Sequence, residues 1–138
     1  ATGNRLWQTT ETPVPDHILQ GPHGEQVQHS AIVGDTIYNS GFTVSLQTGE
    51  PVSGWKWQKS GNCGVLATSA SCGFSRFDTA RMFNLKTGES SALTKVIRPG
   101  CWINMLPAGG LILMPEASAG CTCGYSIQTS IALTPRDG

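Results

Sequence analysis

Short apolar runs separated by turn residues recur along the chain and predict β-strands. Residues 31–33, 36–38 and 111–114 are typical runs, and Gly-Asp, Thr-Gly or Gly-Gly pairs stand beside them. Apolar segments this short, bounded by Gly, Pro and Asp, indicate strands joined by tight turns. We therefore expect an all-β chain, in which only residues 79–84 are ambiguous between strand and helix.

A Thr-Gly pair occurs three times, and its second and third copies share the longer phrase Leu-x-Thr-Gly-Glu. The intervals between its glycines, Gly3, Gly49 and Gly88, are 46 and 39 residues. A repeat of roughly 40 to 50 residues is typical of one four-stranded propeller blade. Because a closed ring needs about 4 to 8 blades, the sequence predicts about three four-stranded antiparallel blades of a β-propeller, forming part of a ring.

The repeat divides the whole chain into successive units of one propeller. In the first full blade we expect strands at 30–33, 36–40, 42–46 and 52–57, and in the last blade a final strand at 126–133. The expected units are the end of a blade (1–10), a loop across one face (11–28), three blades (29–60, 61–98 and 99–134) and a tail (135–138).

Charge and hydropathy argue against two classes of partner. The chain of 138 residues has nine basic and nine acidic side chains and a formal net charge of zero. Without a basic stripe, nucleic acid and anionic membrane surfaces are poor partners. No apolar stretch approaches the roughly 18 residues that a membrane-spanning helix needs. Because the chain opens inside a repeat and without Met, we expect it to be a processed product or the C-terminal part of a longer protein.

Several phrases resemble the pyrroloquinoline-quinone-type (PQQ-like) β-propeller repeat family. Residues 1–7, Ala-Thr-Gly-Asn-Arg-Leu-Trp, are similar to the end of its tryptophan-docking repeat. Residues 98–104, 107–110, 114–118 and 120–123 resemble the C-terminal ending of large exported PQQ-like proteins of planctomycete-type bacteria. The resemblance implies a propeller fold and a periplasmic or cell-surface location. The tryptophans expected to dock one blade on another are Trp7, Trp55 and Trp102, although Trp55 follows its turn glycine by six residues and the copy at Gly88 has Leu93 instead.

Five cysteines are more than a reduced cytosolic β protein usually carries, which favours an oxidising compartment. The candidates for disulfide bonds are Cys63, Cys72, Cys101, Cys121 and Cys123. Because side chains alternate along a strand, the Cys-x-Cys pair would present both thiols on one face, within reach of the third cysteine of that blade if their strands are neighbours. The pairing stays open, and for Cys63 and Cys72 a disulfide and two free thiols are equally compatible with the sequence.

A metal site is the alternative interpretation of the C-terminal cysteines. Thiolates of Cys101, Cys121 and Cys123 with the imidazole of His29 would suit a tetrahedral metal. His17 and His23 lie in the long loop and match no compact metal motif. No Cys-x-x-Cys-His sequence for covalent haem attachment is present.

Two functional hypotheses follow, and the sequence leaves open whether the chain is part of an enzyme. The first is a non-catalytic scaffold that closes a larger exported ring and binds other propeller blades or protein subunits; it expects no catalytic residue and no cofactor in this piece. The alternative is part of a quinone- or metal-dependent oxidoreductase, with PQQ, calcium or another metal held mainly by other blades. Asn104 and Glu116 would be the contributors to a calcium site here.

Overall fold

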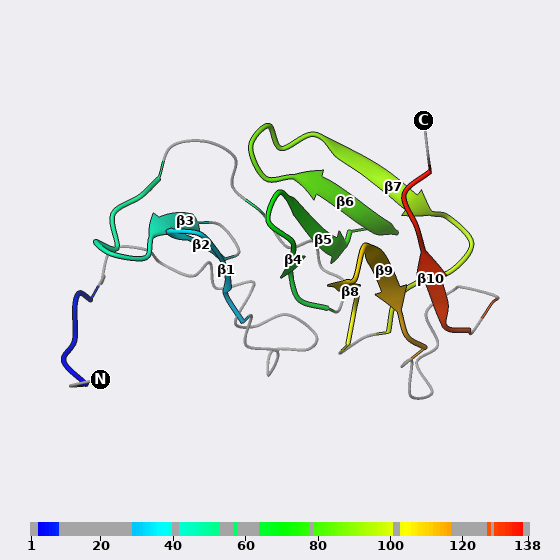
Figure 1. Cartoon of the computed structure of the whole chain (residues 1–138), viewed down its shortest axis with the longest axis horizontal. Coiled ribbons are helices and arrows are strands. Elements are labelled where there is room, and N and C mark those ends of the chain that lie inside the picture. Colours follow the sequence, from blue (N-terminus) through cyan, green and yellow to red (C-terminus); the bar gives the residue numbers. More distant parts are fainter. Residues whose placement is uncertain are drawn as a thin grey trace.

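The structure, a computed structural model, describes residues 3–8, 29–39, 42–52, 57, 64–77, 79–100, 103–116, 127 and 129–136. These residues form ten β-strands in three antiparallel sheets, and they contain no helix. Figure 1 shows the sheets following one another along the chain, each built from strands that are neighbours in sequence. The predicted all-β class is confirmed.

The first sheet is a meander of β1 (Ala31–Val33), β2 (Thr36–Asn39) and β3 (Phe42–Ser45). Gly34 has φ 58°, so the Gly-Asp pair makes the tight turn that the sequence predicts between β1 and β2. The fourth strand expected at 52–57 is represented by a single bridge between Pro51 and Val44 on β3. Residues 53–56 lie outside the described part of the chain.

The second sheet has four strands in sequential order. They are β4 (Ala67–Thr68), β5 (Cys72–Arg76), β6 (Ala80–Asn84) and β7 (Ser90–Thr94). The ambiguous segment 79–84 therefore forms a strand, because all five residues of β6 pair with β5. The register between β6 and β7 shifts next to Ala80 and Arg81, which places a bulge in the outer pair of strands.

The third sheet differs from the prediction. It contains β8 (Leu106–Ala108), β9 (Leu111–Met114) and β10 (Ile131–Leu133), in the order β8-β9-β10. Among the described residues only the second sheet has the four strands predicted for each sheet, and the arrangement as propeller blades stays a prediction. The last strand is also shorter than the expected 126–133, and Ile127 instead makes a parallel bridge to Ile97.

The sheets contact one another through their first strands. β1 contacts β4, and β4 contacts β8. The sheets fan out from this line, so that β3, β7 and β10 lie toward the outside (Figure 1). The main core lies between the second and third sheets, where Phe74, Ala80, Met105 and Met114 are all buried. Burial of such apolar side chains is the dominant stabilising term in a β fold.

Candidate functional site

The second and third Thr-Gly turns have the same backbone geometry. In the first sheet, the Ser45 amide donates to the Glu50 carbonyl at 2.9 Å, and the Gly49 amide donates to the Ser45 carbonyl at 2.9 Å. In the second sheet, Asn84 takes the place of Ser45, with corresponding distances of 2.8 and 2.8 Å. Gly49 and Gly88 have φ 73° and 75°, a conformation that glycine adopts without steric cost.

Side chains complete both turns in the same way. The Ser45 hydroxyl accepts hydrogen bonds from the amides of Gln47 and Thr48, and the Asn84 Oδ1 accepts from the equivalent amides of Lys86 and Thr87. Such local bonds stabilise turns that Ser and Asn favour. Two copies of the repeat therefore fold alike, and Gly3 has the same left-handed backbone, with φ 70°.

Trp7 packs on the turn that contains Gly49. Its Nε1 donates to the Leu46 carbonyl at 2.8 Å, and the indole covers Gly49 so closely that a Cβ there would approach three indole carbons to under 3.0 Å. The glycine is thus required twice, for its positive φ and for the approach of the ring. Trp7 joins the end of one repeat to the turn of the next.

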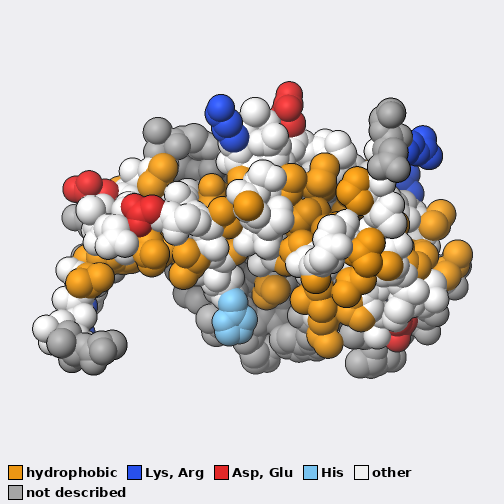
Figure 2. All heavy atoms as spheres, viewed as in Figure 1, with side chains coloured by type: hydrophobic (Ala, Val, Ile, Leu, Met, Phe, Trp, Pro, Cys, Tyr) orange, Lys and Arg blue, Asp and Glu red, His pale blue; other side chains and the backbone are white. Residues whose placement is uncertain are grey.

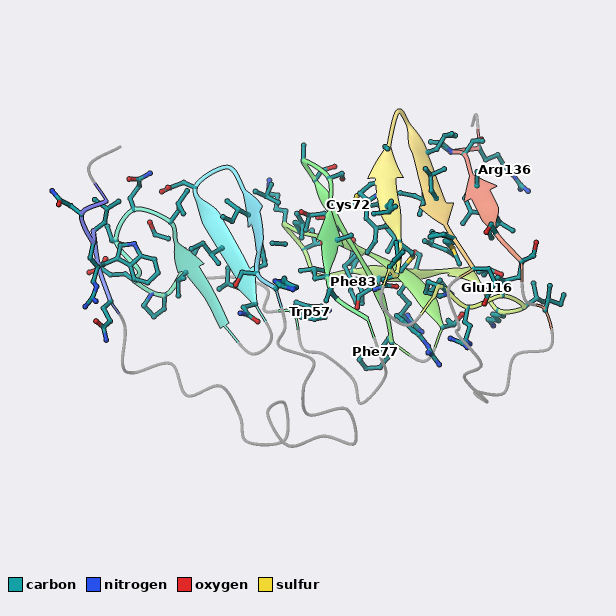
Figure 3. All side chains as sticks on the ribbon, turned by 90° about the horizontal axis from the view of Figure 1, so that it is seen from below. Trp57, Cys72, Phe77, Phe83, Glu116 and Arg136 are labelled. Carbon is teal, nitrogen blue, oxygen red and sulfur yellow. The ribbon has the colours of Figure 1, made fainter. Side chains whose placement is uncertain are left out.

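The other tryptophans named as docking residues, Trp55 and Trp102, lie outside the described residues. Trp57, at the end of the strand expected at 52–57, is 1% exposed. Figure 3 shows it between the first and second sheets. Two apolar or aromatic residues spaced two apart share one strand face, but which of several tryptophans is buried depends on tertiary packing, so sequence spacing alone could not single out Trp57.

An apolar cleft of about 510 Å³ separates the second and third sheets. No charged residue lines it, and hydroxyl groups of Ser69 and Thr134 are its polar side chains. Hydrophobic side chains gather over this part of the molecule in Figure 2. The apolar side chains that line the cleft from strands of both sheets include Phe74, Met82, Leu93, Pro107, Ile112 and Leu133.

The third sheet is apolar on both faces. Its inner face packs on the second sheet through Ile112, Met114 and Leu133. On the opposite face Leu106, Leu113 and Ala132 lie side by side in register. Leu106 is 46% exposed and Ala132 is exposed. Among the described residues, nothing covers this second apolar row completely.

The hairpin between β8 and β9 determines which residues of β10 direct their backbone N–H and C=O groups toward the open edge of the sheet. Gly109 and Gly110 have φ 57° and 78°, the pattern of a type I′ two-residue turn closed by a hydrogen-bonded pair. Hydrogen-bonded and non-hydrogen-bonded pairs alternate along the strands, starting from the pair that closes the turn. The backbone N–H and C=O of Leu113 therefore face β8, and those of the residues on either side of it face β10. Ala132, opposite Leu113, therefore directs its N–H and C=O away from β9, toward the open edge of the sheet.

The candidate metal ligands are mostly not described. Cys63, Cys101, Cys121 and Cys123 lie outside the described residues, as do His17 and His23. Cys72 on β5 carries a free thiol, and His29 is exposed. Within the described ranges, no three His, Cys, Asp or Glu side chains are grouped closely enough to hold a metal.

The two residues considered for calcium lie in different surroundings. Asn104 is 1% exposed, and its Nδ2 donates to the Val65 carbonyl while its Oδ1 has no hydrogen-bond partner. Glu116 is exposed after the end of β9, and its backbone amide donates to the Ser130 hydroxyl at 2.9 Å. Figure 3 shows Glu116 on the third-sheet side of the molecule.

Comparison with known proteins finds no matching family model, no matching curated protein and no matching solved structure. In the part of the chain that is described, no helix is long and apolar enough to cross a membrane.

Proposed function

We propose that the chain is a non-catalytic scaffold, the terminal blades of a larger exported PQQ-like propeller, and that it closes the ring and binds other blades or subunits. The observation that carries this proposal is the apolar row on the third sheet, in which Leu106 and Ala132 are exposed and Leu113 between them is half-buried. A sheet that is apolar on both faces is normally covered on both faces. Exposed apolar patches mark protein-binding surfaces.

Two further observations support a ring-like arrangement. The three sheets contact one another through their first strands, β1, β4 and β8, as blades around a common axis do. Trp7 also links one repeat to the next through Leu46 and Gly49. Further sheets packed on the outer faces of the first and third sheets would extend the row of sheets in the same way. The PQQ-like assignment rests on the sequence resemblance, and the exported location rests on that resemblance and on the number of cysteines.

The experiment replaces an apolar residue on the exposed row by a charge. Leu106→Asp should lower the fraction of the chain that sediments as an assembly by about tenfold, because a buried unpaired carboxylate is strongly disfavoured. The matched control is Gln47→Asp in the exposed turn of the first sheet, which should leave assembly unchanged. Equal assembly of the two variants would show that the row is not an interface.

A further inference from the structure

We infer that the open edge of β10 and the apolar cleft beside it form one binding site for an extended β-strand of another chain. This inference deepens the proposed function, because it names the kind of segment through which a partner would bind. It starts from a difference between sheets. The second sheet has a fourth strand, β7, outside its third, whereas the third sheet ends at β10 within the described residues.

The backbone of β10 is arranged to accept a strand. The N–H and C=O of Ala132 point to the open edge, as the alternation from the Gly109–Gly110 turn requires. Its side chain is exposed and small, so it does not block the approach of a second strand. An edge with such groups is a ready template for strand addition.

The two outer strands differ in how their edges are protected. β7 pairs with β6 through a bulge, which opposes further pairing, and it begins with the exposed serines Ser90 and Ser91. β10 reads Ile-Ala-Leu, with no polar side chain and no bulge in its pairing with β9. The edge of β10 is therefore the one suited to a partner.

The cleft would contact the side chains of the bound strand, whereas the edge of β10 would pair with its backbone. Leu93 on β7 and Leu133 on β10 line it from the outer strands of the two sheets. A strand added to β10 would lie opposite β7, and alternate side chains would turn toward the cleft. Because the lining has no charge, these side chains should be apolar.

A second copy of the chain fits this site less well than a separate strand. Pairing two β10 strands would join only three residues from each copy, since Pro135 follows closely. It would also offer at most Ile131 and Leu133 of the second copy to a cleft of about 510 Å³. An extended segment from a different protein meets both the edge and the cleft.

The test uses a fluorescein-labelled peptide of alternating valine and threonine with a lysine at each end, titrated against the full chain and followed by fluorescence anisotropy. We expect saturable binding. Ala132→Pro, which removes the outward N–H, should raise Kd about tenfold or more. The matched control is Ala92→Pro on the exposed edge strand β7, which should change Kd by less than about twofold.

A second control changes the peptide instead of the protein, so that its outcome does not depend on whether a proline variant folds. The same peptide N-methylated at every residue has no backbone N–H to donate to a strand edge, and it should bind the unaltered chain about tenfold more weakly. Equal affinity for both peptides, equal loss in both proline variants, or no binding up to the solubility limit would overturn the inference. So would a dimer that Ala132→Pro abolishes, which would identify a second copy as the occupant. Peptide binding is measured on the chain itself, so its failure is distinguishable from failure of the Leu106→Asp assembly test.

Discussion

The indole nitrogen of Trp7 donates a hydrogen bond to the backbone carbonyl of Leu46, 39 residues further along the chain, at a distance of 2.8 Å. The same indole rests on Gly49, the central glycine of the turn that follows. The Trp7 side chain therefore makes both a hydrogen bond to the next repeat and a close packing contact with its turn glycine. A hydrogen bond of this type contributes about 1 kcal/mol, and ring burial adds to it.

Gly49→Ala should destabilise the chain more than Gly34→Ala does. Both substitutions place a Cβ at a positive φ, which costs about 1–2 kcal/mol. Only the alanine at position 49 would also collide with Trp7, whereas nothing lies within 4 Å at position 34. We expect a further loss of about 1–3 kcal/mol in the free energy of unfolding, measured by urea denaturation. Equal losses would show that the ring does not rest on the turn in solution.

Asn84→Ala should lower the free energy of unfolding by about 1 kcal/mol. The substitution removes the side-chain oxygen that accepts hydrogen bonds from the amides of Lys86 and Thr87. Lys86→Ala in the same turn is the control, because that side chain is exposed and should contribute little. Urea denaturation of both variants makes the comparison, and a cost at Lys86 as large as at Asn84 would contradict this account of the turn.

Met105→Ala and Leu106→Ala should differ sharply although the residues are neighbours. Met105 is 1% exposed and belongs to the core between the second and third sheets, whereas Leu106 is 46% exposed. Truncation of a buried methionine typically costs about 2–5 kcal/mol, and truncation of the exposed leucine should cost under about 1 kcal/mol. Thermal unfolding of the monomeric fraction tests this, and similar costs would mean that the two sheets do not pack as described.

Cys72 should be alkylated without prior reduction. Its thiol is free and half-buried on β5, so iodoacetamide should modify it slowly under native conditions and fully after unfolding. Peptide mapping of the unreduced protein measures the modification. A disulfide between Cys72 and any other cysteine, found in the same map, would contradict the prediction.

Local requirements explain what could be predicted from the sequence. The turns at Gly49 and Gly88 were predictable because a positive φ is a property of one residue, and the Thr-Gly-Glu phrase marks both. The alternation of short apolar runs likewise predicted β1, β2, β3 and β9 within a residue or two. These features depend on contacts between chain neighbours.

Features that depend on the position of a partner strand were missed. Pro107 lies in β8, although proline is disfavoured inside a strand. It faces Ile112 in a non-hydrogen-bonded pair, where a backbone N–H would point away from β9, so the missing N–H costs no bond to β9. The cleft between Leu93 and Leu133 exists only once two sheets have packed. Sequence spacing carries no signal for either feature.

The central claim is that this arc of sheets works as part of a larger protein assembly. A native mass spectrum of the protein as isolated from its source tests it most directly. We predict that the 14.6 kDa chain is found within a heavier complex, held there through the exposed faces and edge of the third sheet. A stable monomer at its bare mass in dilute solution, with no associated protein, would contradict the claim.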